Sequence, residues 1–414
     1  MRIGVVGYGT GGQNFHTPFI EAADDVELVG VVARSPQRMA AVAHDWPGVP
    51  IYGSLTDLLA AGVDAVTITT PPATRRELVL EAVAAGVHVI ADKPFAPNAA
   101  AARELDHAAA EAGVLLSVYH NRRWDADIRT LQEIITAESL GELWRVHSRF
   151  DLDDPATLEA GPDGGLLRDL GTHLVDQMLW LLGPVTAVTA HLDWIELPEG
   201  RTDAGFVIAL QHASGARSYI ESTKINRLAV RELRAYGSSG SYRSYGTDVQ
   251  AQSIFAGHRP AAEPETWGYE PEDNWGILAT AGGKQHVPSA QGRYQDLYTQ
   301  FAAAARGEGP QPVPAAEGVR TLVILDARPG KRRAGPDGCD RRSELVHIRP
   351  GNSSGPQPPR VCSPCLDPPR SPAQGAVTGI APSVERTARE PATELDPAEP
   401  GAPRADHCGA GANA

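Results

Sequence analysis

The stretch RIGVVGYGTGG, residues 2–12, decides the fold of this chain. Its apolar start reads as a buried strand, and Gly7, Gly9 and Gly12 follow in the spacing G-x-G-x-x-G. Glycines at these positions permit a tight turn and let backbone amides approach a pyrophosphate at the start of the next helix. We therefore predict a dinucleotide-binding turn, with a purely structural glycine turn as the alternative. The residues predicted to contact the dinucleotide here are Gly7, Gly9, Thr10, Gly11 and Gly12.

The segments that follow the glycine turn predict an α/β domain. Four further strand-like runs, VELVGVVA, DAVTITT, VHVIA and VLLSVY, alternate with Ala-rich segments of helical period such as residues 74–86 and 98–113. Strands separated by such helices form βαβ units and a parallel sheet. Residues 1–119 are therefore expected to fold as a Rossmann domain with a doubly wound parallel sheet.

The end of the second strand, VVARSPQR at residues 31–38, indicates which dinucleotide is bound. NAD-binding domains keep an acidic residue for the ribose 2′-hydroxyl about 20 residues after the glycines. Here Arg34 and Ser35 occupy that place, and Arg38 follows one helical turn later. Because guanidinium and hydroxyl groups suit a 2′-phosphate, we favour NADP over NAD. The alternative is that both arginines are solvated surface residues.

Two loops after later strands predict where chemistry takes place. The run DAVTITT ends at Thr70 and is followed by Pro71, and the run VHVIA leads into Asp92 and Lys93. Open α/β sheets bind their ligands at the carboxyl ends of the strands, so the Lys93 ammonium group is a candidate for contact with substrate. Pro94 keeps the backbone of Lys93 extended, which suits an aimed side chain. The alternative is a solvated loop lysine.

The segment GGLLRDLGTHLVDQ, residues 164–177, places Asp169 and His173 four residues apart. As metal ligands they fall short of the three protein ligands that a zinc site needs. In a structural interpretation, Asp169 caps a helix that begins near Thr172 and His173 packs beneath that helix. In a catalytic interpretation, the imidazole is a base near neutral pH and the carboxylate orients it. We favour catalysis and keep the structural interpretation as the alternative.

Taken together, these motifs resemble the Gfo/Idh/MocA family of oxidoreductases. The resemblance spans residues 2 to about 326 and rests on GVVGYGTGG, TTPP, ADKPF, LLSVYHNRRWDAD and GGLLRDLGTHLVDQ. The stretches VYHNRRWD and FAGHRPAAEPETWG are most similar to its NADP-dependent scyllo-inositol dehydrogenase branch. Two positions depart from the family pattern. Asp92 replaces the glutamate of an E-K-P motif, and Arg75 stands where members often carry histidine, so we leave Arg75 out of the predicted site.

The resemblance implies a reaction and a role for each site residue. Hydride passes between NADP(H) and a secondary alcohol or ketone of a cyclic polyol or sugar, as in an inositol dehydrogenase. The resemblance makes His173 the group that exchanges the hydroxyl proton, Lys93 the hydrogen-bond donor to the reacting oxygen, and Asp169 the group that orients His173. The pocket is also expected to include Thr70, Pro71, Asp92 and His120 toward the cofactor, and Tyr119, Asn121 and Arg123 toward the substrate. A non-catalytic NADP-binding sensor of the same fold is the alternative function.

Residues 120–327 are expected to form a second, α+β domain with a large, mostly antiparallel open sheet. The runs LWRVHSRFDL, VTAVTAHLDWIE, AGFVIALQH and ARSYIESTK alternate in the manner of strands, and a helix is expected within NRRWDADIRTLQEII. A hairpin is predicted to turn at Ser214 and Gly215. The resemblance implies that such a sheet joins copies of the chain, so we expect a homodimer or homotetramer.

Residues 328–414 differ in composition from the rest of the chain. They contain all four cysteines, no Phe, Tyr or Trp, and much Pro and Gly, which is typical of sequence that cannot bury a core. Pro329 and Gly330 predict that the preceding helix ends near Ala327. We expect a disordered tail without a catalytic role that arose by a shift of reading frame or as newly acquired sequence, and a natural disordered tail is the alternative. Loss of the family's terminal strand would expose a sheet edge.

Composition excludes several classes of partner. The formal charge is -14 and the pI is about 5.4, whereas nucleic acids and anionic membranes require a basic surface. No apolar run is long enough to span a membrane, and the N-terminus lacks the pattern of a secretion signal. We therefore expect a cytoplasmic protein that acts on a small molecule, without nucleic acid, membrane or metal.

Overall fold

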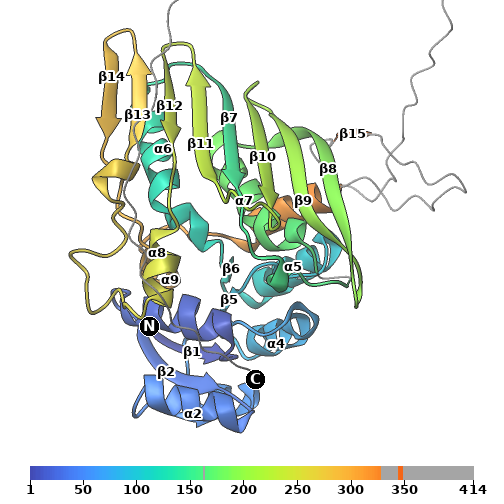
Figure 1. Cartoon of the computed structure of the whole chain (residues 1–414). Coiled ribbons are helices and arrows are strands. Elements are labelled where there is room, and N and C mark those ends of the chain that lie inside the picture. The colour runs from blue at the N-terminus through green and yellow to red at the C-terminus, as the bar shows by residue number, and fades with distance from the viewer. Residues whose placement is uncertain (162–163, 328–343, 348–414) are drawn as a thin grey trace, which may run out of the picture. The chain divides into compact units, whose positions relative to one another are not determined.

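The computed structural model of this chain describes residues 1–161, 164–327 and 344–347, the last as backbone only. These residues contain a parallel α/β domain and a second domain built on a larger sheet (Figure 1). Within them, no helix is both long and apolar enough to cross a membrane.

The first domain is a doubly wound Rossmann sheet, as predicted. Its six strands pair in parallel in the order β3-β2-β1-β4-β5-β6, which is the strand order of dinucleotide-binding folds. Strand β3 has two residues and was not predicted, because so short a segment carries no periodic signal. The strands are β1 Arg2–Val6, β2 Glu27–Val32, β3 Ile51–Tyr52, β4 Ala65–Ile68, β5 His88–Ala91 and β6 Leu116–Val118.

Polar caps begin the helices that cover this sheet. Ser35 and Asn98 accept hydrogen bonds from the backbone N–H groups at the starts of α2 and α5, and Gly113 ends α5 with a φ of 68°. The segment after the glycine turn differs, because it begins as a π-helical turn, η1, before α1. The elements are η1 Gly11–His16, α1 Thr17–Glu21, α2 Pro36–Asp45, α3 Leu55–Ala60, α4 Pro72–Ala84 and α5 Ala99–Ala112.

The second domain contains a nine-stranded, mostly antiparallel sheet in the order β14-β13-β12-β11-β7-β10-β9-β8-β15. Strands β7 and β10 pair in parallel, and the predicted hairpin joins β9 to β10 with Gly215 at a φ of 91°. The strands are β7 Leu143–Phe150, β8 Val185–Leu197, β9 Gly200–His212, β10 Arg217–Thr223, β11 Arg231–Gly237, β12 Gly240–Ser244, β13 Gly276–Thr280, β14 Gly283–Val287 and β15 Glu344–His347.

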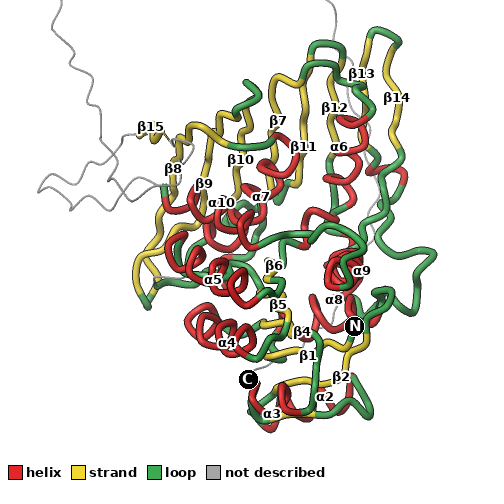
Figure 2. Tube along the Cα trace, turned by 180° about the vertical axis from the view of Figure 1, so that it is seen from behind, coloured by secondary structure: helices red, strands yellow, loops and turns green. Residues whose placement is uncertain are grey.

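Helices of the second domain lie against one face of this sheet. Figure 2 shows α6, α7 and α10 on the same side of the sheet, and α10 packs on both α5 and α7. The inward side chains Val146, Ile208 and Ile220 are fully or almost fully buried. The helical elements are η2 Asn121–Trp124, α6 Ala126–Thr136, η3 Pro155–Thr157, η4 Leu167–Gly171, α7 Thr172–Leu182, α8 Val249–Phe255, η5 Glu272–Asn274, α9 Gln295–Ala305 and α10 Ala315–Asp326.

The end of the chain corrects one expectation. Helix α10 ends at Asp326 with Ala327 as its cap, as predicted. However, strand β15 lies inside the predicted tail and pairs with Ala187–Ala190 of β8, so it covers part of the edge that we expected to be exposed. The other residues of the predicted tail, including all four cysteines, lie outside the described residues.

Candidate active site

The glycine turn between β1 and η1 has the shape that a dinucleotide requires. Gly7 has a φ of 104°, and a Cβ atom on Gly12 would lie 2.3 Å from the Gly7 carbonyl oxygen. Both positions therefore need glycine. A Cβ atom on Gly9 would meet nothing within 4 Å, so this part of the turn faces open space. The turn thus fits the approach of phosphate groups to the backbone at the start of the helical segment.

The two residues predicted to bind the 2′-phosphate directly after β2 differ in their environment. Arg34 is exposed, and its side chain makes no hydrogen bond or ion pair with the part of the chain that the structure describes. The Ser35 hydroxyl accepts a hydrogen bond from the Arg38 N–H at 3.3 Å, which caps α2. Ser35 therefore has a structural task beside its predicted contact with the cofactor, whereas Arg34 is available to an external anion.

Arg75 connects the two loops that carry the predicted chemistry. It is buried, its Nε donates to the Thr70 carbonyl at 2.7 Å, and its Nη1 donates to the carbonyls of Asp92 at 3.0 Å and Pro94 at 2.6 Å. Thr70 also accepts a hydrogen bond from the Thr74 hydroxyl at 2.9 Å. Arg75 therefore orients the loops after β4 and β5, a positioning role that its exclusion from the predicted site overlooked.

Asp92 connects the loop of Lys93 to His16 at the end of η1, the segment after the glycine turn. Its Oδ1 accepts from the Lys93 backbone N–H at 2.7 Å, and its Oδ2 lies 3.7 Å from His16 Nε2 and 3.6 Å from Arg75 Nη2. Burial raises the pKa of Asp92, but His16 and Arg75 outweigh that effect and lower it to about 2. His16, whose Nδ1 lies 2.6 Å from the Tyr298 hydroxyl, was not predicted, because nothing in the local sequence marks its partner.

Lys93 and Asp169 meet, as the predicted site requires. Lys93 Nζ donates to Asp169 Oδ1 at 2.6 Å and to the Asp169 carbonyl at 3.0 Å. A second lysine, Lys224, donates to Asp169 Oδ2 at 2.8 Å and was not predicted. Burial raises the pKa of Asp169, but the two ammonium groups outweigh it and hold the pKa below its ordinary value. Asp169 is therefore an anion shared by two cations.

His173 lies beside this group but makes no hydrogen bond or ion pair with Asp169. Both oxygens of Asp169 are occupied by lysines, and the His173 Nδ1 atom is buried without a hydrogen-bond partner among the described residues. The predicted orientation of His173 by Asp169 is therefore wrong. Asp169 lies in the π-helical turn η4 and His173 in the α-helix that follows, so the i, i+4 geometry of a regular α-helix does not apply. Nor does Asp169 cap α7.

Burial keeps the imidazole of His173 neutral. Burial lowers the pKa of His173 well below its ordinary value, and the positive charges of Lys93 and Arg122 lower it further. An unpartnered ring nitrogen in a buried position is costly and points to a ligand or water as its partner. The side chain therefore has the protonation state of a base and an unused hydrogen-bonding atom.

A short loop before η4 sets the position of Asp169. Asp203 on β9 accepts a hydrogen bond from the Leu167 N–H at 2.6 Å and so holds the start of the π-helical turn. Gly165 has a φ of 95°, and a Cβ atom there would lie 2.1 Å from Asp203 Oδ1. Only glycine therefore lets the loop pass this close to the carboxylate.

The predicted pocket residues after β6 are buried. His120 Nε2 lies 3.8 Å from Asp176 Oδ1, and the His120 ring centroid lies 6.1 Å from that of His173. Burial lowers the pKa of His120 to about 4 although Asp176 opposes the shift. Tyr119 donates to the Phe15 carbonyl, and its ring lies against His16 at 3.9 Å. Thus His120 adjoins the candidate base, whereas Tyr119 supports the segment after the glycine turn.

Arg123 does not have the free guanidinium that a substrate ligand needs. Its Nε and Nη2 donate to both oxygens of Asp176 at 2.7 and 2.6 Å, and its Nη2 lies 2.7 Å from Glu317. The ion pair is buried and joins η2 to α7 and α10. We therefore correct the predicted substrate contact of Arg123 to a packing role. Asn121 is buried, and its side chain makes no hydrogen bond with described residues.

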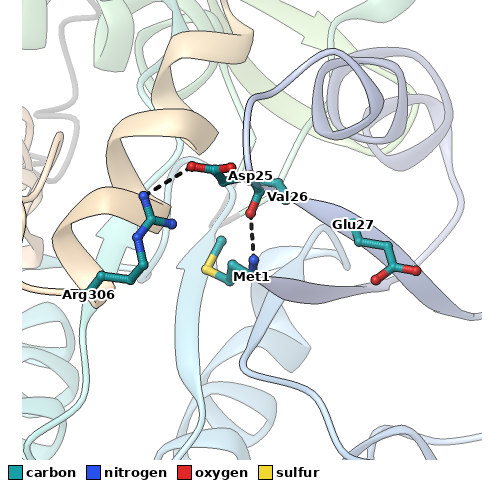
Figure 3. Close-up of a pocket in the computed structure, with 5 residues that line it drawn as sticks. All are labelled: Met1, Asp25, Val26, Glu27 and Arg306. Carbon is teal, nitrogen blue, oxygen red and sulfur yellow. Dashed lines mark hydrogen bonds and ion pairs between the residues drawn. The ribbon is translucent and has the colours of Figure 1, made fainter.

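A surface hollow elsewhere on the molecule lacks a group of side chains comparable to Lys93, Asp169 and His173. It is lined by Met1, Asp25, Val26, Glu27 and Arg306 (Figure 3). There Arg306 pairs with Asp25 at 3.3 Å, and the amino terminus donates to the Asp25 carbonyl. Among the described residues, no group of three His, Cys, Asp or Glu side chains is placed to hold a metal ion. The Lys93, Asp169 and His173 group remains the candidate active site.

Comparison with family models matches both domains. Residues 1–120 match an oxidoreductase family with an NAD-binding Rossmann fold, and residues 128–243 match the GFO/IDH/MocA C-terminal domain. Among solved structures, an oxidoreductase named yvaA from Bacillus subtilis is 30% identical with a TM-score of 0.71, and the alignment covers 78% of this chain and 95% of that chain. The oxidoreductase YPO2259 of Yersinia pestis is 32% identical with a TM-score of 0.71, and the alignment covers 79% of this chain and 93% of that chain.

Two full-length relatives agree with these matches. The uncharacterized oxidoreductase YdgJ of Escherichia coli is 32% identical over 336 residues, which cover 79% of this chain and 94% of that protein. The NADP(+)-dependent scyllo-inositol 2-dehydrogenase IolW of Bacillus subtilis is 29% identical over 337 residues, which cover 79% of this chain and 92% of that protein. With family models matched in both domains and a relative that is 32% identical over most of both chains, the protein belongs to the Gfo/Idh/MocA family of oxidoreductases.

Proposed function

We propose that this protein is an NADP(H)-dependent dehydrogenase that interconverts a secondary alcohol and a ketone on a cyclic polyol or sugar of the inositol type. The observation that carries the proposal is the cluster at the carboxyl end of β5, where Lys93 binds Asp169 of η4 beside a neutral His173 of α7. The named activity of one relative is scyllo-inositol 2-dehydrogenation with NADP(+). Another relative, of Rhizobium rhizogenes, is named D-apiose dehydrogenase and is 29% identical over 219 residues.

The hydrogen bonds of Lys93 leave it able to bind the reacting oxygen. An ammonium group has three N–H donors, and Lys93 uses two of them on the carbonyl and the Oδ1 of Asp169. The third donor is free to bind a substrate oxygen and to stabilise the negative charge that develops on it. Asp169 therefore orients Lys93, in place of the contact with His173 that the sequence had indicated.

His173 is the proton acceptor in this proposal. Its lowered pKa keeps the imidazole neutral at physiological pH, so it can take the proton of the substrate hydroxyl. A nicotinamide dinucleotide bound at the glycine turn supplies the hydride acceptor. Because His120 is neutral as well, neither imidazole adds positive charge beside Lys93 before the reaction begins.

The preference for NADP rests on Arg34. The exposed guanidinium directly after β2 is free to form a charge-assisted hydrogen bond with a 2′-phosphate, and Arg38 is the second cation nearby. The free Arg34 side chain, together with the absence of an acid at this strand end, favours NADP over NAD.

Assembly through the large sheet is part of the same proposal. The sheet face opposite the helices carries His147 stacked on Tyr219 at 4.8 Å, with Tyr236 beside them and an exposed Val207 on β9. Aromatic and apolar side chains on an open face are typical of protein interfaces. We propose a homodimer or homotetramer that buries this face, and light scattering of the purified protein measures the assembly.

A substrate panel tests the proposed function against the alternative of a non-catalytic sensor. The full chain is mixed with NADP or NAD and a set of inositols and aldoses, and the absorbance of the reduced nicotinamide is followed. Turnover of a cyclic polyol or sugar with NADP is the expected result. Tight NADP binding without turnover across the panel would favour the sensor, because such a protein does not need the Lys93 and His173 arrangement.

A further inference from the structure

Lys224 lies at the active site but has no place in the reaction described above. It directly follows β10, only 6% of the residue is exposed, and its Nζ donates to Asp169 Oδ2 at 2.8 Å and to the Thr157 carbonyl at 3.4 Å. A buried lysine is uncommon and needs a partner to remain charged. Its place in the chain, 55 residues from Asp169, is set by the pairing of β10 with β7 and β9.

The two lysines occupy different oxygens of one carboxylate. Lys93 binds Oδ1 and Lys224 binds Oδ2, so rotation of the Asp169 carboxylate would break one charge-assisted hydrogen bond or both. The side chain of Asp169 is 42% exposed, so burial alone does not hold it in place. Lys224 therefore holds the second oxygen of the Asp169 carboxylate, whereas Lys93 binds the first oxygen and the Asp169 backbone carbonyl.

We propose that Lys224 is a positioning residue that acts through Asp169 to aim Lys93 at the reacting oxygen. This inference rests on the proposed function. Lys224 makes no contact with the reacting atoms in this scheme. Its ammonium group fixes the far oxygen of Asp169 and adds a positive charge behind the carboxylate. The alternative is an ion pair that only stabilises the fold, in which case Lys224 affects stability without affecting the chemical step.

Kinetics of substituted enzymes separate these two roles. Loss of a charge-assisted hydrogen bond that matters in the transition state is expected to lower kcat by about 10- to 100-fold in K224M. KM should change by no more than about 3-fold, because Lys224 does not bind the substrate. K224R should recover most of the activity, since it restores the charge on Oδ2. The control is K284M, which removes an exposed lysine on β14.

A double-mutant cycle tests whether Lys224 acts through Asp169. In a D169N background the carboxylate is absent, so K224M should lower kcat by no more than about 3-fold further. Independent, multiplicative losses in the double variant would overturn the proposal, as would a K224M enzyme with wild-type kcat. If K224M does not fold, K224Q replaces it, because glutamine keeps polarity and most of the length while it removes the charge.

A readout without turnover separates failure of this inference from failure of the proposed function. Amine-reactive labelling of Lys93, measured by mass spectrometry, should proceed at a different rate in K224M and K224Q than in the wild type and K284M, because Lys93 and Lys224 share the Asp169 carboxylate. If the wild type turns over no substrate of the panel but labelling changes in this way, the proposed function fails and the positioning role stands. Unchanged labelling together with unchanged kcat in an active enzyme refutes the positioning role alone.

Discussion

Replacement of His120 by asparagine should make the stability of the protein less sensitive to acid. His120 is 2% exposed, and burial lowers its pKa from the ordinary 6.5 to about 4. The folded protein therefore binds the proton more weakly than the unfolded chain does. A histidine of this kind leaves stability intact above about pH 6.5, and stability is lost as the pH falls from there through about 4.

The size of the effect follows from the pKa difference. Each unit of pKa difference corresponds to about 1.4 kcal/mol. Stability is lost between about pH 6.5 and about pH 4, and most of that range is covered by a change from pH 7 to pH 5. Protonation of His120 should therefore remove about 2 kcal/mol from the free energy of unfolding of the wild type over that change. His120→Asn has no imidazole to protonate, so its loss over the same range should be smaller by that amount. The other histidines titrate in both proteins, and the larger causes of the lowered pKa of His173, which are burial and the charge of Lys93, are also present in both.

Urea unfolding at the two pH values, followed by tryptophan fluorescence, measures the difference. The control is His107→Asn, which removes an exposed histidine of α5 and should lose as much stability as the wild type. If His120→Asn and the wild type lost equal stability on acidification, the inference that His120 is held neutral by burial would be wrong.

Three further predictions concern the base, the cofactor and the end of the chain. His173→Ala should lower kcat by roughly 100-fold while NADP affinity, measured by fluorescence titration, stays near the wild-type value. Because the pKa of His173 is lowered, the acid limb of the wild-type pH profile should lie below pH 6.5; a limb above that value would exclude His173 as the base. Arg34→Gln should weaken the binding of NADP by about 10-fold more than the binding of NAD. Equal losses of affinity for the two cofactors in isothermal titration would show that Arg34 has only a structural role. A chain ending after residue 347 should keep full activity, whereas one ending after residue 327 should melt at a lower temperature, because it exposes the β8 edge; identical melting curves would contradict the pairing of β15.

Local sequence determined the scaffold of this protein. Gly7 is required by its positive φ, and Gly12 is required because its backbone passes close to the Gly7 carbonyl. Both causes depend on only a few consecutive residues. The strand runs and their spacing predict the parallel sheet, because side-chain periodicity records which faces are buried. The positions of Lys93 and His173 were predictable for a similar reason, since the ends of parallel strands and the starts of helices can be recognised in the sequence.

The tertiary structure decided which groups act on one another. Asp169 and His173 are near neighbours in sequence, yet Asp169 binds Lys93, 76 residues away, and Lys224, 55 residues away. The π-helical turn at η4 removes the i, i+4 relationship that the sequence suggested, and such a turn has no simple sequence signal. Arg75 is likewise ordinary in sequence and gains its role only where two loops of the sheet converge. Long-range charge pairing depends on how strands and helices pack together, so sequence spacing alone does not reveal it.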